Sequence, residues 1–113
     1  MKRVQMKRRQ PSREMDVHFA CRGQRFCWDS DKAVANFKKH GIHFEHACEV
    51  FFDPFVILVD ASPDDEAREA VLGFTEDWTL LFVVHVIGER GVHRIISARR
   101  ATRTERRTYE DNG

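Results

Sequence analysis

Two apolar runs joined by a short glycine-containing connection constrain the fold more than any other stretch. Residues 79–87 (TLLFVVHVI) and 92–98 (VHRIISA) are rich in β-branched and aromatic residues, which favour strands. The connection Gly88-Glu89-Arg90-Gly91 has the composition of a hairpin turn. Strands joined by such a short turn pair antiparallel. The sequence therefore predicts an antiparallel sheet built around this hairpin.

Shorter elements are expected before and after the hairpin. The predicted strands are 16–20, 24–28, 55–59 and 68–74, and the predicted helices are 31–40, 44–52 and a last one that starts after Thr102. Suitable capping residues stand at the helix ends, namely Asp29, Ser30, Gly41 and the pair Thr102 and Glu105. Strand 55–59 is nearly all apolar, so both of its faces are expected to be covered.

This order of elements predicts an α+β domain. We expect an antiparallel sheet of about four strands, a short N-terminal hairpin, and two N-terminal helices and one C-terminal helix packed on the sheet. The chain of 113 residues suits a single domain, which we place at 15–113 after a flexible basic tail at 1–14. No apolar run approaches the ~20 residues of a membrane span, and the N-terminus has no apolar signal segment. A cytoplasmic protein that does not enter a membrane is expected.

Charge is distributed unevenly, although the formal net charge is only +1. Residues 1–14 hold six basic residues and one acid, and residues 90–113 hold seven arginines and three acids. Between them, residues 41–89 hold eleven acids and a single arginine, Arg68. Basic segments suit phosphate groups or an acidic partner. Solvated surface is the alternative interpretation, and we favour it for 1–14.

Metal-dependent and nucleophilic chemistry have little support. His40, His43 and His46 recur every three residues with Cys48 beyond them, but Gly41 is expected to end a helix between the first two. Zinc sites usually combine Cys and His pairs with a second pair elsewhere, and the other histidines are scattered. The three cysteines form no CxxC pair and are odd in number, so small buried thiols are expected. We expect no metal and no cofactor.

Metal-free cleavage of RNA suits the side chains that remain. RNA supplies its own 2′-hydroxyl nucleophile, so the protein has to supply proton transfer and cations for the phosphate charge. Each candidate has an alternative: Arg68 can pair with nearby acids, His85 can be a core histidine, and Lys39 can be a solvated helix residue. The candidate catalytic residues in or beside predicted elements are Lys39, His40, Arg68, His85, Arg94 and Arg99.

Residues 24–110 resemble the BrnT family of bacterial toxins. The matching motifs are Phe26-Cys27-Trp28-Asp29, Lys32, Asn36, Lys39-His40-Gly41, Phe44-Glu45, Phe51, Asp53, Arg68, Gly73, His85, Arg94-Ile95-Ile96-Ser97-Ala98-Arg99, Glu105-Arg106-Arg107 and Tyr109-Glu110. Their order and spacing make the resemblance specific, although each motif alone is weak. The sequence departs from the family at Cys27, where a Glu is common, and at His43 and His46, where a Ser-x-x-Glu cap is common.

The resemblance implies a metal-independent endoribonuclease with a RelE-like fold, which inhibits translation as the toxin of a type II toxin-antitoxin system. It implies a BrnA-type antitoxin as partner, with operator DNA contacted only through that antitoxin. Arg68, Arg94 and Arg99 match arginines of the family. Trp28, Lys39 and His40 match its opening motif. Trp28, Arg100 and Arg106 are the candidate substrate-binding residues.

Two questions stay open at the level of sequence. Residues five apart in a regular strand point to opposite faces, so Arg94 and Arg99 can line one pocket only if the strand ends or bulges near Ser97-Ala98. The second question is whether the chain cleaves RNA at all. The alternative function is a non-catalytic module that uses its arginines to bind an acidic protein or a nucleic-acid backbone.

Overall fold

The computed structural model describes residues 15–60 and 68–112. The tail predicted at 1–14 and an acidic turn expected at 62–66 lie outside the described residues. The elements are β1 Asp16–Cys21, β2 Gln24–Asp29, α1 Ser30–His40, α2 Phe44–Ala47, the 3-10 helix η3 Cys48–Phe52, β3 Ile57–Val59, β4 Glu69–Phe74, β5 Leu80–Ile87, the 3-10 turn η4 Glu89–Gly91, β6 His93–Arg100 and α3 Arg103–Asp111.

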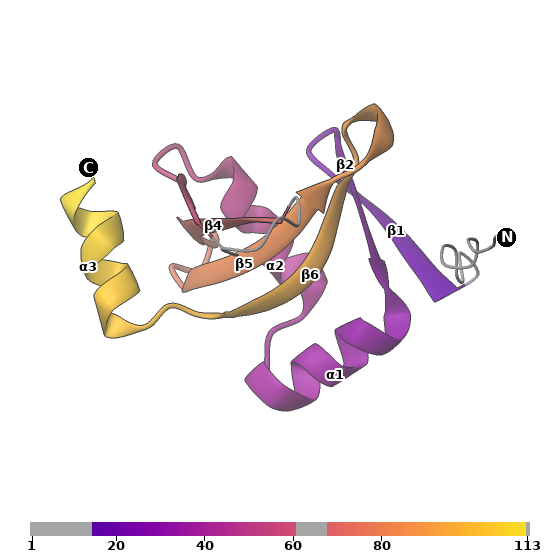
Figure 1. The fold of residues 1–113 in the computed structure, drawn as a ribbon, viewed down its shortest axis with the longest axis horizontal. Coiled ribbons are helices and arrows are strands. Elements are labelled where there is room, and N and C mark those ends of the chain that lie inside the picture. Colours follow the sequence, from indigo (N-terminus) through magenta and orange to yellow (C-terminus); the bar gives the residue numbers. More distant parts are fainter. Residues whose placement is uncertain (1–14, 61–67, 113) are drawn as a thin grey trace, which may run out of the picture.

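A single six-stranded sheet joins all the strands in the order β1-β2-β6-β5-β4-β3 (Figure 1). The predicted hairpin of β5 and β6 is confirmed, and every pair except one is antiparallel. The exception is β2, which runs parallel to β6 with Phe26 opposite His93 and Cys27 opposite Arg94. Strands β3 to β6 form the expected antiparallel meander, but the N-terminal hairpin joins them in one mixed six-stranded sheet. The expectation of an antiparallel sheet of about four strands plus a hairpin is therefore not confirmed. The α+β class is confirmed.

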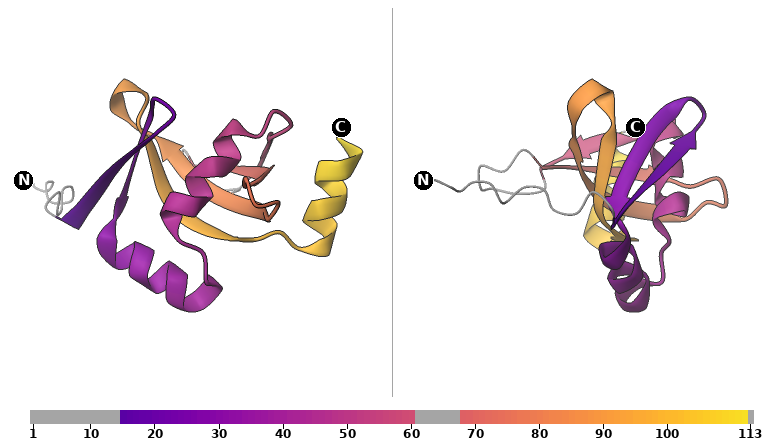
Figure 2. Two further views of the ribbon diagram at one scale, coloured as in Figure 1. Left: turned by 180° about the vertical axis from the view of Figure 1, so that it is seen from behind. Right: turned by 90° about the vertical axis from the view of Figure 1, so that its right-hand side faces the viewer.

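The core lies between one face of the sheet and the segment formed by α1, α2 and η3 (Figures 1 and 2). We call this side of the sheet the helix-covered face. Its buried side chains from strands are Phe26, Trp28, Val71, Leu81, Val83, Ile95 and Ala98, and those from the helical segment are Ile42, Phe44, Ala47, Cys48 and Val50. Two of the three cysteines, Cys27 and Cys48, are buried as expected.

A buried asparagine attaches α1 to the central strand. The Asn36 side-chain amide donates to the carbonyl oxygens of Ile42 at 3.2 Å and Ala98 at 2.9 Å. Its own oxygen accepts from the Ala98 backbone N–H at 3.1 Å. Satisfying a buried amide in this way avoids the cost of an unpaired polar group, so the three bonds also fix where α1 sits along β6.

Helix α1 begins and ends as its capping residues predict. The Asp29 carboxylate accepts from the backbone N–H groups of Asp31 and Lys32, and Gly41 adopts a left-handed φ of 73° at the C-terminus. The second predicted helix, 44–52, is only in part an α-helix: α2 has four residues and continues as the 3-10 helix η3. The prediction of two full N-terminal helices is therefore not confirmed.

The last helix packs at the end of the sheet. Thr102 and Glu105 form both bonds of a capping box, as predicted. None of the α3 side chains is buried, and the helix extends beyond the end of β6 (Figure 1). One of its contacts is made by Tyr109, which meets the Phe74 ring edge-on at 5.3 Å. Helix α3 thus packs on the sheet as expected, but only at its end, on Phe74 of β4.

Strand β3 also differs from the prediction. It has three residues and forms one edge of the sheet, beside β4. Phe55 before it is 68% exposed and Leu58 within it is 66% exposed. The apolar run at 55–59 predicted a strand covered on both faces, and that was wrong because an edge strand here presents Leu58 to solvent. No helix among the described residues is long and apolar enough to cross a membrane.

Candidate functional site

A β-bulge places Arg94 and Arg99 on the same face of the sheet. In the pairing of β5 with β6, Val84 lies opposite Ser97 but its neighbour His85 lies opposite Ile95, so Ile96 is an extra residue in β6. Arg99 then lies opposite Phe82, and Arg94 lies opposite Val86. These partners are four apart in β5 and share a face. We call this side, opposite the helix-covered face, the arginine face.

Arg94 is bound by a carboxylate of β1. Its Nη2 donates to Asp16 Oδ1 at 2.7 Å and its Nη1 to Asp16 Oδ2 at 3.1 Å, with Cys27 Sγ 3.4 Å from Nη1. The Asp16 side chain is 6% exposed. The hydrogen bond that Arg94 donates to Asp16 raises the pKa of Arg94 above its ordinary value. The pair ties β1 to the central strand across β2.

Arg99 is bound by a carboxylate of α3. Its Nη1 donates to Glu105 Oε1 at 2.8 Å and its Nη2 to Glu105 Oε2 at 2.9 Å. The guanidinium also lies 4.2 Å from the centre of the Phe82 ring, a cation–π distance. The hydrogen bond from Arg99 lowers the pKa of Glu105. This pair attaches α3 to the end of β6.

The two arginines predicted to bind substrate, Arg100 and Arg106, lie near Arg99, where β6 ends. Arg100 is exposed at the last position of the strand. Arg106 is exposed on α3, and its guanidinium is 5.7 Å from the centre of the Phe74 ring. Arg99, Arg100 and Arg106 thus belong to one basic region where β6 passes into α3.

His85 lies at the opposite end of the sheet, on the helix-covered face. Its ring is 1% exposed and packs edge-on against Phe51 with the centroids 4.9 Å apart. Its Nδ1 is 3.2 Å from the Nδ1 of His93, and its Nε2 is 3.7 Å from Glu69 Oε1. Burial lowers the pKa of both His85 and His93, so both rings are neutral near pH 7.

Arg68 is placed at this same end. It is exposed and directly precedes Glu69, the residue opposite His85 in the pairing of β4 with β5. Arg68 and His85 therefore lie at the same end of the sheet. The structure separates them from Arg99, Arg100 and Arg106 by the length of the strands.

The remaining candidates lie elsewhere. Lys39 is exposed and His40 is partly exposed in the last turn of α1. Trp28 is 2% exposed, and its ring packs against Phe19 at 5.8 Å and Phe44 at 5.7 Å. Because this ring is enclosed in the core, it has no free face on which an RNA base can stack.

The three histidines of the metal alternative do not converge. His46 Nε2 is 3.2 Å from Asp77 Oδ1, and the His43 ring stacks on Phe37 with the centroids 4.1 Å apart. Across residues 15–60 and 68–112, no group of three His, Cys, Asp or Glu side chains is arranged to hold a metal ion. His46 instead belongs to a network that fixes the turn between β4 and β5.

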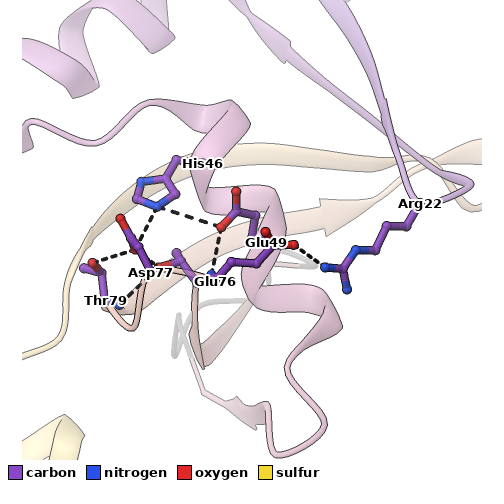
Figure 3. A network of polar contacts seen from close by, with 7 residues as sticks. Arg22, His46, Glu49, Glu76, Asp77 and Thr79 are labelled. Carbon is purple, nitrogen blue, oxygen red and sulfur yellow. Dashed lines mark hydrogen bonds and ion pairs between the residues drawn. The ribbon is translucent and has the colours of Figure 1, made fainter.

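Figure 3 shows this network, which joins the turn to His46 of α2, to Glu49 of η3 and to Arg22. Asp77 accepts hydrogen bonds from the Thr75 and Thr79 hydroxyls, and together with His46 these bonds lower the pKa of Asp77 to about 2. Glu49 accepts from the Glu76 backbone N–H at 2.9 Å, and Arg22 pairs with the Glu76 carboxylate. The turn holds Trp78 at a φ of 65° with 77% of its surface exposed.

Sequence reasoning missed His93, Glu69 and Asp16. The predicted hairpin itself could have pointed to His93. When Ile87 pairs with His93, the His93 side chain lies diagonally across from His85 on the same face of the sheet. No comparable local signal existed for Asp16, which meets Arg94 from a strand 78 residues earlier in the chain.

Comparisons with known proteins agree with this fold. The family model described as ribonuclease toxin, BrnT, of type II toxin-antitoxin systems matches residues 28–105. The structure is similar to the crystal structure of the Brucella abortus ribonuclease toxin BrnT, with a TM-score of 0.54 and 20% sequence identity over 67% of this chain and 94% of that one. No curated protein matches the sequence. The chain belongs to the BrnT family of toxins of type II toxin-antitoxin systems.

Proposed function

We propose that this protein is a metal-independent endoribonuclease that inhibits translation and is neutralised by a BrnA-type antitoxin. The observation that carries the proposal is the family match over residues 28–105, which includes Arg68, His85, Arg94 and Arg99. An antitoxin partner is expected of any type II toxin. Contact with operator DNA would then be made by the antitoxin.

The geometry favours the end of the sheet that carries Arg68 and His85 as the catalytic centre. Cleavage requires a base for the 2′-hydroxyl proton and a cation for the charge that develops on the phosphate. Arg68 is exposed there, and the neutral imidazoles of His85 and His93 lie at the same end. The guanidinium groups of Arg94 and Arg99 already bind carboxylates, so they suit a structural role or a secondary contact with RNA.

The test is cleavage of a defined RNA by purified protein in the presence of EDTA. We expect the wild type to cleave and Arg68→Ala to lose about 10²–10³ in rate, as is usual when a charge-stabilising group is removed. Arg107→Ala removes an exposed arginine on α3 and serves as the matched control. Equal rates in all three proteins would contradict the site, and loss of wild-type cleavage in EDTA would contradict the metal-independent mechanism.

The bound state of Arg94 and Arg99 favours one alternative, a binding module that does not cleave RNA. In that case Arg94 and Arg99 stabilise the fold through their ion pairs, and the protein acts by binding a partner on its surface. Growth arrest by an Arg68→Ala variant that cleaves no RNA would support this alternative. Loss of both toxicity and cleavage in that variant would support the enzyme.

A further inference from the structure

A chain of three polar side chains crosses the sheet at the end that carries Arg68. It runs from Glu69 of β4 to His85 of β5 and on to His93 at the first position of β6. The first step is 3.7 Å, from Glu69 Oε1 to His85 Nε2, and the second is 3.2 Å between the two Nδ1 atoms. His85 is buried, whereas Glu69 and His93 are partly exposed. The row of three side chains is therefore open to solvent at both ends and buried at its middle residue.

The contact between the two Nδ1 atoms is a hydrogen bond only if one ring donates and the other accepts. If His85 donates, its Nε2 is an unprotonated lone pair facing the Glu69 carboxylate, which repels it. If His93 donates, His85 carries its proton on Nε2, directed at that carboxylate. The buried Nε2 of His85 has no hydrogen-bond partner among the described residues, and the Glu69 carboxylate faces it at 3.7 Å. The second arrangement is favoured electrostatically, because it places a proton and not a lone pair toward that negative charge.

The same arrangement leaves the second nitrogen of His93 unprotonated. A neutral imidazole has one donor and one acceptor nitrogen, so donation from Nδ1 makes Nε2 the acceptor. Aromatic rings keep both histidines neutral: Phe51 of η3 lies against both, and Phe26 of β2 lies 5.7 Å from His93. Glu69 is the charged group that faces the pair. A neutral ring with an oriented proton on one nitrogen is the form that a general base requires.

We propose that His93 Nε2 is the general base of this ribonuclease and that His85 and Glu69 are positioning residues that fix its tautomer. The inference rests on the proposed function. His93 Nε2 takes the proton of the RNA 2′-hydroxyl, and the 2′-oxygen forms a bond to the adjacent phosphorus. The bond from phosphorus to the 5′-oxygen breaks, and that oxygen takes a proton from water. The products are a 2′,3′-cyclic phosphate and a free 5′-hydroxyl, and His93 then releases its proton to solvent.

The tautomers can be measured without any RNA. In the full-length protein labelled with ¹⁵N at histidine, two-bond couplings should show His93 protonated at Nδ1 and His85 protonated at Nε2 above pH 7. A His93 protonated at Nε2 would overturn the proposal, whether or not the protein cleaves RNA.

Kinetics test the role of the base. His93→Gln should reduce cleavage by about 10²–10⁴, the usual contribution of general acid–base catalysis. The control His18→Gln changes an exposed histidine of β1 and should leave the rate unchanged. Glu69→Gln should move the acidic limb of the pH–rate profile of cleavage, which loss of packing alone would not do. His93→Gln with the wild-type rate, or Glu69→Gln with an unmoved profile, would overturn the inference while the proposed function stands. A wild type that cleaves no RNA would overturn both.

Discussion

Arg94 and Arg99 lie on one face of the sheet although they are five positions apart in the strand. A regular strand would place them on opposite faces, and the extra residue Ile96 reverses the alternation between them. Each guanidinium then meets a carboxylate, Asp16 for the first and Glu105 for the second. The bulge therefore determines which two segments of the chain are tied to the central strand.

Removal of Arg94 should destabilise the protein through β1. Arg94→Ala removes a bidentate pair from Asp16, whose side chain is almost fully buried. We expect the free energy of unfolding to fall by about 1–3 kcal/mol, the range for hydrogen bonds to charged groups. Urea unfolding measures the change, and Arg25→Ala, an exposed position of β2, is the control. A loss no larger than that of the control would show that the pair contributes nothing.

The pair of Arg99 and Glu105 should be weaker, because both side chains are partly exposed. Glu105→Gln keeps a residue that suits the capping box while removing the charge. We expect Arg99→Ala and Glu105→Gln each to cost about 0.5–1.5 kcal/mol, with a favourable coupling in the double-mutant cycle. Additive effects would contradict a direct interaction. If Arg99→Ala abolishes RNA cleavage while Glu105→Gln does not, Arg99 has a role in catalysis beyond attaching α3.

Gly73 should tolerate no side chain. A Cβ at this position would lie 2.8 Å from the Val50 carbonyl oxygen and 3.1 Å from Val56 Cγ2. Gly73→Ala should therefore lower the free energy of unfolding by about 1–3 kcal/mol, the usual cost of overpacking. Gly88→Ala is a matched control, because its Cβ would meet only the Val92 carbonyl oxygen at an ordinary 3.5 Å. Equal melting temperatures for the two variants would contradict the packing.

Acidification should destabilise the fold through the histidine pair. Burial lowers the pKa of His85 and His93 in the folded protein, whereas both titrate at about 6.5 when unfolded. As the pH falls below about 6.5, the unfolded chain takes up protons that the folded chain does not. The free energy of unfolding should fall between pH 7 and 5, as measured in urea. His85→Gln should reduce that pH dependence, and an unchanged dependence in His85→Gln would contradict the assignment.

Local sequence signals predicted the elements well because local interactions determine them. Asp29, Gly41 and the Thr102–Glu105 box mark helix ends through bonds to their own neighbours in the chain. Alternation and turn composition likewise identified the hairpin of β5 and β6. Such signals carry no information on partners far along the chain, so the parallel pairing of β2 with β6 was missed.

The candidate site was harder to predict for the same reason. The six catalytic candidates divide between two ends of the sheet and the end of α1. Burial of Trp28 depends on Phe19 and Phe44, which come from different elements. The bulge at Ile96 has no mark in the sequence, because two adjacent isoleucines suit a regular strand equally well.

The position of β6 between β2 and β5 has a consequence for how the protein is made. Residues 93–100 leave the ribosome after all five other strands, and only then can the hairpin of β1 and β2 join the rest of the sheet. Until that moment the hairpin of β1 and β2 is not paired with the other strands of the nascent chain, and both parts have open strand edges. Long-range pairing is slow, and exposed strands can aggregate in this state. His93, Arg94 and Arg99 belong to this last strand, so the sheet is completed and these side chains are added in the same step.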